Sequence, residues 1–306
     1  MTARPQIGVI LNHEQEPGEP APRWRDMCDF AGAAESVGVS HLWLVDHFGW
    51  EDDPFERPNS TIPSDLGVWE AWTTLAALAA HTQRISLGTL VTCTRYRNPT
   101  LLAKMADSVD EISSGRLILG LGAGDYPEEQ LAFGYDTDRP VGHFEEALAI
   151  VTGLLRHGSI DFDGTFYRAH AELRPRGPTP GGPPILIGSL GHGPRVLGLV
   201  ARFADMWNGW ITDRSSSRSV PPIRDAVDTA CRKAGREPAT LRRSVAVAVA
   251  FGGPMAQRAG SMTGSDEEIA IALSAFADVG IDDVQVRLFP NTPSSVERLG
   301  QIIAVM

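Results

Sequence analysis

Short apolar runs alternate along this chain of 306 residues with longer stretches in which apolar residues recur at helical spacing. The short runs have the length and composition of buried strands, and most of them end in Gly, Asp or Asn. Strands are predicted at 6–11, 41–45, 85–92, 116–121, 185–187, 204–208, 244–251 and 284–288. A predicted helix follows each of them, so the pattern indicates eight strand–helix units in strict order.

The ends of several predicted helices carry recognisable signals. Asn98-Pro99 is typical of an N-cap followed by proline at the first helical position. Ser265 with Glu268, and Ser294 with Glu297, have the spacing of a capping box. The other helices are predicted over about 22–37, 68–81 and 142–155, and from residues 194 and 222 onward.

Strict alternation of strands and helices predicts parallel strands joined by right-handed crossovers. Eight units in a chain of this length fit an α/β fold of the (β/α)8 TIM-barrel type, with 1–306 as a single domain. Insertions are expected after the second, fourth and seventh strands, at about 51–67, 125–140 and 252–264. A doubly wound open sheet is the alternative, because a strand count does not establish closure.

One segment departs from this alternation. Asp163-Gly164 lies between alternating apolar residues of the segment 159–168 and predicts a β-hairpin. A connector rich in Pro and Gly, 174–184, follows it before the alternation resumes.

Charge and cysteine content limit the classes of partner. Lys and Arg total 27 against 38 Asp and Glu, and a net charge of -11 disfavours binding to nucleic acid or to anionic membranes. Cys28, Cys93 and Cys231 are far apart, as expected in a reducing compartment. The N-terminus lacks a signal-peptide pattern and no run reaches the ~18 apolar residues of a membrane span. These features predict a cytoplasmic protein, and no His/Cys spacing predicts a metal site.

In a barrel of this type the active site lies on the loops after the strands. Asp46-His47-Phe48-Gly49-Trp50, after the second predicted strand, combines groups that could move a proton and stack on a ring; a capped strand end is the alternative. Gly120-Leu121-Gly122-Ala123-Gly124-Asp125, after the fourth, indicates close backbone approach. Its spacing is GxGxG and not the GxGxxG of a dinucleotide fold.

Two later strand ends add a candidate anion site and candidate pocket walls. Gly188-Ser189-Leu190-Gly191-His192-Gly193 leads into a helix, whose free N–H groups would attract a phosphate, although a glycine-rich turn without a ligand remains the alternative. Trp207 and Trp210 could wall an apolar cavity or pack at the barrel rim.

Taken in order, several motifs resemble those of the luciferase-like monooxygenase superfamily, and its coenzyme F420-dependent oxidoreductase branch in particular. They are Asp46-His47-Phe48 and the segments 69–75, 84–91, 97–99, 110–116, 120–124, 162–164, 184–188 and 204–205. Each motif is weak alone, and their ordered set carries the resemblance. Two segments differ from many relatives: the residues after the fourth strand, and a longer loop after the fifth.

The resemblance implies a flavin-type ring at the barrel mouth and assigns roles to individual residues. It implies a non-proline cis peptide near Leu90-Val91, with Thr92 beside it, as the support of the ring. It makes His47 the candidate for proton handling, with Asp46 next to it. The ring and ribityl chain would lie along Gly122, Ala123, Gly124 and Asp125, and the phosphate along Gly188, Ser189, Gly191 and Gly193.

Three functions are compatible with these features. The first is hydride transfer between F420 and a small organic substrate, with Phe48, Trp50, Trp207 and Trp210 lining an apolar pocket. The second is an FMN-dependent monooxygenase of the bacterial-luciferase type, served by a separate cofactor reductase. The third is a barrel that binds a ligand without catalysis. The resemblance also implies a homodimer.

Overall fold

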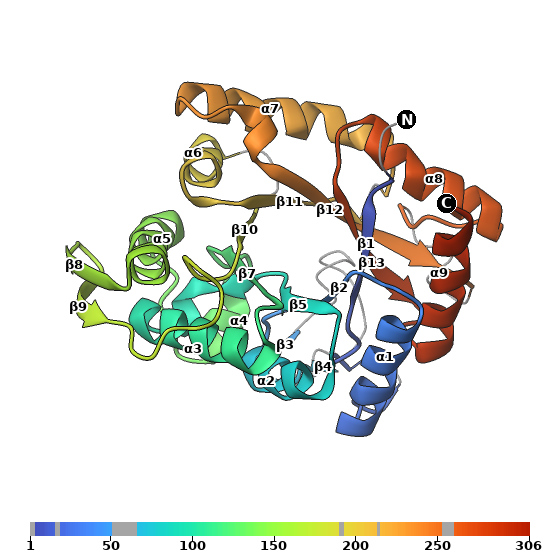
Figure 1. The fold of residues 1–306 in the computed structure, drawn as a ribbon, viewed down its shortest axis with the longest axis horizontal. Coiled ribbons are helices and arrows are strands. Elements are labelled where there is room, and N and C mark those ends of the chain that lie inside the picture. The colour runs from blue at the N-terminus through green and yellow to red at the C-terminus, as the bar shows by residue number, and fades with distance from the viewer. Residues whose placement is uncertain (1–3, 16–18, 51–65, 190–192, 213–214, 253–259) are drawn as a thin grey trace.

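The computed structural model describes residues 4–15, 19–50, 66–189, 193–212, 215–252 and 260–306, and its fold is a closed barrel (Figure 1). The barrel strands are β1 (Gln6–Ile10), β2 (His41–Leu44), β5 (Ser86–Thr89), β7 (Leu117–Gly122), β10 (Ile185–Gly188), β11 (Met206–Trp210), β12 (Arg242–Ala250) and β13 (Asp283–Phe289). Each pairs in parallel with the next, and β13 pairs with β1. The β7–β10 and β1–β13 pairings close the sheet, which confirms the TIM barrel over the open doubly wound sheet.

Helices surround the barrel and follow its strands in chain order (Figure 1). They are α1 (Trp24–Ser36), α2 (Ala71–His81), α3 (Pro99–Ser113), α5 (Pro140–His157), α6 (Pro194–Phe203), α7 (Val220–Lys233), α8 (Asp266–Asp278) and α9 (Pro293–Val305). The insertion after the fourth barrel strand contains one more short helix, α4 (Pro127–Ala132). Most of the insertions after the second and seventh strands, 51–65 and 253–259, lies outside the described residues. Within the described part of the chain, none of the helices is both long and apolar enough to cross a membrane.

Smaller elements complete the fold. The two-residue strand β6 (Thr92–Cys93) pairs with β7 beyond the end of β5. Strands β3 (Gly49–Trp50) and β4 (Leu66–Gly67) form a short antiparallel pair. The structure describes 3-10 turns at η1 (Thr94–Tyr96), η3 (Ser217–Ser219) and η4 (Pro238–Thr240).

The predicted hairpin is present, with a longer turn than expected. Strands β8 (Ser159–Asp163) and β9 (Arg168–Glu172) pair in antiparallel fashion at the outer edge of the molecule beside α5 (Figure 1). Asp163 still belongs to the strand, and the Gly164 amide donates to the carbonyl of Tyr167. The carboxylate of Glu146, on α5, accepts from the backbone amides of residues 165–167. A tertiary contact with α5 therefore supports a longer loop than the two-residue turn that Asp163-Gly164 suggested.

Two main apolar clusters lie on the two sides of the sheet. The larger fills the layer between strands and helices, and the smaller fills the barrel interior. The interior cluster consists of Ile10, Trp43, Val45, Leu90, Ile118, Leu186, Met206 and Ala246. A third and smaller cluster consists of Ala248, Ala250 and Phe289. Alternate residues of a strand face opposite sides of the sheet, so neighbouring residues of several strands, such as Leu42 and Trp43, belong to different clusters.

The interior also contains a buried polar contact beside the cluster. The Trp43 indole N–H on β2 donates to Oε1 of Gln285 on β13, and the two side chains meet over β1, the strand between them. A Cβ at Gly8 would lie 2.0 Å from that oxygen and 2.8 Å from the indole nitrogen. Glycine at position 8 is therefore required for these two side chains to meet.

The helix-end signals were correct in two of three cases. The Asn98 side chain accepts from the amide of Thr100, and Ser265 forms the expected capping box with Glu268. The third prediction was wrong, because α9 begins two residues earlier than Ser294 implied. Its N-cap is Thr292, whose hydroxyl accepts from the amide of Ser295.

Candidate active site

The candidate active site lies where the carboxyl ends of β1, β2, β5 and β7 meet. Because these strands are parallel neighbours, the loops that follow them share one end of the barrel. The loops bring together residues 12–14, 46–50, 90–97 and 123–135, which are remote from one another in the sequence.

A bulge in the chain occupies this end of the barrel. Strand β5 ends at Thr89, the Leu90–Val91 peptide bond is cis, and β6 resumes the pairing with β7 at Thr92. Leu90 is buried in the interior cluster, and Val91 packs against that cluster while remaining partly exposed. The cis bond implied by the family resemblance is therefore present at the expected position.

The glycines of β7 and β10 make room for this bulge. A Cβ at Gly120 would lie 1.8 Å from the carbonyl oxygen of Thr89, and one at Gly122 would lie 2.6 Å from a methyl of Val91. A Cβ at Gly188 would approach the same valine to 3.2 Å. The sequence predicted close backbone approach at the alternating glycines, and the structure identifies the segment that approaches them as the one around Val91.

A chain of side-chain hydrogen bonds fixes the bulge from behind. The Trp72 indole N–H donates to Oγ1 of Thr92 at 3.0 Å, and that hydroxyl donates to Oγ1 of Thr89 at 2.8 Å. The Thr89 hydroxyl in turn donates to the carbonyl of Gly120 at 2.9 Å. The Thr92 side chain is fully buried among these hydrogen bonds and supports the bulge, while a contact of Thr92 with the cofactor stays a prediction.

Asp46 is engaged in an ion pair and does not contact His47 by a hydrogen bond in the structure. Its carboxylate accepts from both terminal nitrogens of Arg97, at 2.6 and 3.0 Å, and from the amide of Cys93 at 3.1 Å. Arg97 also pairs with Glu70, the N-cap of α2. These contacts give Asp46 a structural role, which ties the end of β2 to β6 and α2. The catalytic role expected from the sequence stays a prediction.

His47 is held by a residue that sequence reasoning did not select. Its Nδ1 lies 3.0 Å from Oε2 of Glu129, on α4. The other carboxylate oxygen of Glu129 accepts from the amides of Phe48 and Gly49, and the Tyr96 hydroxyl donates to Oε2. Glu129 is 2% exposed although it lies in a loop insertion. The local sequence does not distinguish the buried Glu129 from the exposed Glu128 beside it, because both belong to the same polar segment, Tyr126-Pro127-Glu128-Glu129.

The electrostatics of this pair favour the charged forms of both groups. Burial alone would lower the pKa of His47, but the hydrogen bond that its ring donates to Glu129 and the nearby Asp125 and Glu14 carboxylates raise it overall. Burial likewise opposes the Glu129 carboxylate, while its bonds with His47, Tyr96 and the Phe48 amide lower its pKa. The result is an imidazole that carries a proton more readily than a histidine in water.

A second ionic pair lies at the end of β1, a strand end that sequence reasoning passed over. Glu14 is 5% exposed and pairs with the Arg287 guanidinium from β13 at 3.0 Å. Burial would raise the pKa of Glu14, and Arg287 lowers it overall. Next to it, His13 is fully buried, with Nε2 at 2.9 Å from the carbonyl oxygen of Val45. The polar triplet Asn12-His13-Glu14 directly after an apolar run was the signal that could have indicated this pair.

The aromatic residues expected to line a pocket lie in different places. The Phe48 ring packs against Tyr96 and Phe133, with centroids 4.4 and 4.5 Å apart. Trp210 is partly buried against the interior cluster.

Trp207 is fully buried in the outer cluster, with its indole N–H directed at the Ser189 hydroxyl. The assignment of Trp207 to a pocket wall is therefore corrected: its side chain faces the helices, because it alternates with Met206 and Asn208. The side chain of Trp50 lies outside the described residues.

The loop expected to bind phosphate is described only in part. Gly188 is the last residue of β10, Ser189 follows it, and Gly193 is the N-cap of α6, so the helix N-terminus lies at the same end of the barrel as His47. The Ser189 amide is used within the sheet, since it donates to the carbonyl of Asn208 at 2.9 Å. Gly191 lies outside the described residues.

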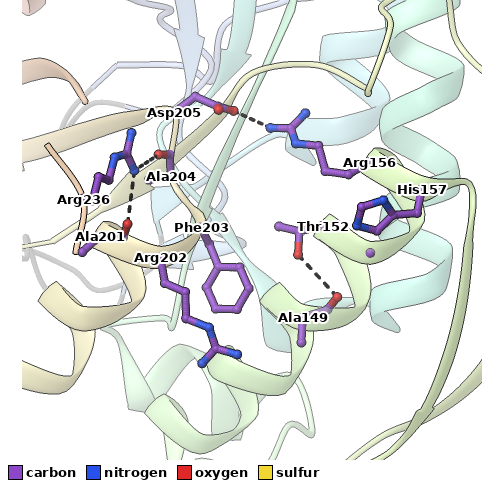
Figure 2. A pocket seen from close by; sticks show the side chains of 11 residues that line it. Ala149, Thr152, Arg156, His157, Ala201, Arg202, Phe203, Ala204, Asp205 and Arg236 are labelled. Atoms are coloured by element: carbon purple, nitrogen blue, oxygen red, sulfur yellow. Dashed lines mark hydrogen bonds and ion pairs between the residues drawn. The ribbon is translucent and has the colours of Figure 1, made fainter. Parts of the chain in front are cut away.

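A groove of about 560 Å³ lies at the other end of the barrel, next to residues that precede β11. Figure 2 shows it between α5 and the end of α6, lined by Arg156, Arg202, Phe203 and Arg236 among others. Arg156 pairs with Asp205, and Arg236 donates to carbonyls at the end of α6 (Figure 2). Arg202 lies over the Phe203 ring. These arginines support helix ends and loops, so the groove is not the candidate active site.

In the described part of the chain, no group of three or more His, Cys, Asp or Glu side chains is arranged to hold a metal ion.

Comparisons with known proteins agree with this architecture. The F420-dependent hydroxymycolic acid dehydrogenase of Mycobacterium tuberculosis is 31% identical over 240 residues, which are 77% of this chain and 60% of the relative. A phthiodiolone/phenolphthiodiolone dimycocerosates ketoreductase of Mycobacterium kansasii is 32% identical over 223 residues, 68% of this chain and 59% of the relative. The chain thus spans about three fifths of the length of these curated relatives.

The structural comparison supports the same fold. A solved F420-dependent secondary alcohol dehydrogenase, in complex with an F420–acetone adduct, matches with a TM-score of 0.80 over 99% of both chains at 17% identity. A family model described as luciferase-like monooxygenase matches residues 6–282, which include the barrel strands from β1 to β12. The chain therefore belongs to the luciferase-like monooxygenase family.

Proposed function

We propose that the protein is an oxidoreductase that transfers a hydride between coenzyme F420 and a small organic substrate, with a ketone and its secondary alcohol as the substrate pair. The observation that carries this proposal is the Val91 bulge at the barrel mouth, on the same side as the His47–Glu129 pair. The names of the curated relatives, a dehydrogenase that depends on F420 and a ketoreductase, support the choice of cofactor and reaction.

The residues present fit a flat cofactor with a phosphate-bearing chain. Val91 offers a partly exposed apolar surface in the barrel mouth, framed by strand ends without side chains at Gly122 and Gly188. We propose that the ring lies against Leu90 and Val91 and passes Ala123, Gly124 and Asp125. The phosphate would bind near Gly188, Ser189 and Gly193, with Gly191 between them, where the N-terminus of α6 favours negative charge.

When bound, the deazaflavin supplies a hydride at a fixed position, and the protein supplies orientation and a proton. Reduction of a ketone adds the hydride to carbon and a proton to oxygen, so a donor acid must lie beside the carbonyl. His47 is suited to this role because its pKa is raised and it lies at the mouth. In the reverse direction the same imidazole accepts the proton of the alcohol. Phe48 and Trp210 are the proposed apolar contacts of the substrate, and Trp50 remains a candidate.

Cofactor binding tests the proposal. Purified protein is titrated with F420 and with FMN, and binding is followed by cofactor fluorescence. Preference for F420, with F420-dependent oxidation of a secondary alcohol such as isopropanol that His47→Ala reduces at least tenfold, is the expected result. Preference for FMN with oxygen consumption would replace the proposal by a flavin monooxygenase. Binding of neither cofactor would refute both and leave a ligand-binding barrel.

A further inference from the structure

The acidic residue that contacts His47 was not among the candidate site residues of the sequence, although it lies within the predicted insertion 125–140. Glu129 lies on the six-residue helix α4, and 82 positions separate it from His47. We propose that Glu129 is a positioning residue, which orients the imidazole of His47 and keeps its Nδ1 protonated so that Nε2 exchanges the substrate proton. The inference rests on the proposed function for its catalytic meaning, while the orientation of His47 is independent of it.

The geometry specifies which atom carries which proton. In the described part of the chain, four groups form hydrogen bonds with the Glu129 carboxylate, and each of them can donate: the His47 ring, the Tyr96 hydroxyl, and the amides of Phe48 and Gly49. The amides of Phe48 and Gly49 can only donate, and the Tyr96 hydroxyl donates because its partner is an ionised oxygen. The carboxylate therefore acts as an acceptor throughout, and the hydrogen between it and His47 resides on Nδ1.

The placement of Glu129 makes this contact stiff. Its Oε1 accepts from the two amides that directly follow His47, the nearer of which is Phe48, so one carboxylate binds both the ring and its backbone. The side chain of Glu129 is 1% exposed, which shields the contact from water. A buried bond of this kind is stronger than its solvent-exposed counterpart.

Three other carboxylates act on His47 through their charge. Asp125 faces it from the loop after β7, Glu14 from the loop after β1, and Asp46 from its own loop. Asp46 is occupied by Arg97, and Glu14 by Arg287. All of these groups favour the imidazolium, and Glu129 differs from them by its direct contact with Nδ1.

Histidine NMR tests the inference without cofactor or turnover. The 15N shifts of His47, assigned by comparison with His47→Ala, are followed through a pH titration of the full chain. Above its titration midpoint, wild-type His47 should be the Nδ1–H tautomer, and an Nε2–H tautomer would overturn the proposal. In Glu129→Gln the midpoint should fall by about one pH unit or more. An unchanged midpoint in the folded variant would also overturn it.

Glu128→Gln is the matched control. Glu128 precedes Glu129 on α4 and its side chain is exposed, so the same charge is removed without the contact. This control should leave the His47 midpoint within about 0.2 pH units of wild type. In the F420-loaded enzyme, Glu129→Gln should move the alkaline limb of the ketone-reduction profile to lower pH by the same shift. Because the tautomer is measured on wild-type protein without cofactor, failure of F420 to bind would refute the proposed function and leave the inference testable.

Discussion

Replacing Arg97 by Met tests whether Asp46 serves the architecture of the site. The Arg97 side chain is 9% exposed and that of Asp46 is fully buried, with both guanidinium nitrogens on the carboxylate. Methionine fills similar space but leaves the carboxylate without its counter-charge. Removing one partner of a buried ion pair costs about 3–5 kcal/mol. At roughly 2–4 °C per kcal/mol for a large domain, the Tm should fall by about 10 °C.

The pH dependence of this loss follows from the burial of Asp46. Burial raises the pKa of its carboxyl group, and Arg97 opposes that effect in the wild type. Without Arg97 the folded-state pKa lies well above the unfolded value of about 3.9. The penalty is therefore present at neutral pH, and it shrinks as the pH falls toward 4 and the carboxyl becomes neutral in both states.

Thermal unfolding followed by circular dichroism at pH 7 and pH 5 measures both effects. Arg174→Met is the control, because Arg174 and Glu172 form an ion pair whose side chains are 78% and 54% exposed. Its loss should cost no more than about 1 kcal/mol. The double variant Asp46→Asn/Arg97→Met should recover most of the stability. A fall in Tm for Arg97→Met that matches the control would refute the structural role assigned to Asp46.

Three further predictions concern the barrel. Gly120→Ala should lower the free energy of unfolding by more than about 3 kcal/mol, because the new Cβ would lie 1.8 Å from the carbonyl oxygen of Thr89. The control Gly198→Ala, whose Cβ would have no neighbour within 4 Å, should be neutral or slightly stabilising in the same thermal unfolding measurement. Burial lowers the pKa of His41 to about 3, so the protein should lose stability as the pH falls from about 6.5 toward 3. His41→Gln should lose less stability over this pH range, and an equal loss in the variant and the wild type would contradict the prediction. Burial raises the pKa of Cys93 to about 12, so iodoacetamide should label Cys93 at pH 8 only after denaturation, as mass spectrometry can establish.

Local sequence signals located the strands and helices of the barrel, although only the paired strands established its closure. Apolar periodicity extends over a strand or a helical turn, and it located the barrel strands and their order. The Asn98 and Ser265 caps were also correct, because a cap involves residues within one turn. The same signals placed the site at the carboxyl ends of the strands, since parallel strands put those ends together.

Contacts between distant residues were decided only by the closed barrel. Asp46 meets Arg97 across 51 positions and His47 meets Glu129 across 82, and no short-range pattern encodes either distance. Trp207 and Trp210 look alike in the sequence, yet strand parity sends the first toward the helices and the second toward the interior. The glycines of β7 are required by a bulge that begins about thirty residues earlier, at Thr89. Side-chain roles at this site depend on register and closure, which exist only once all strands are paired.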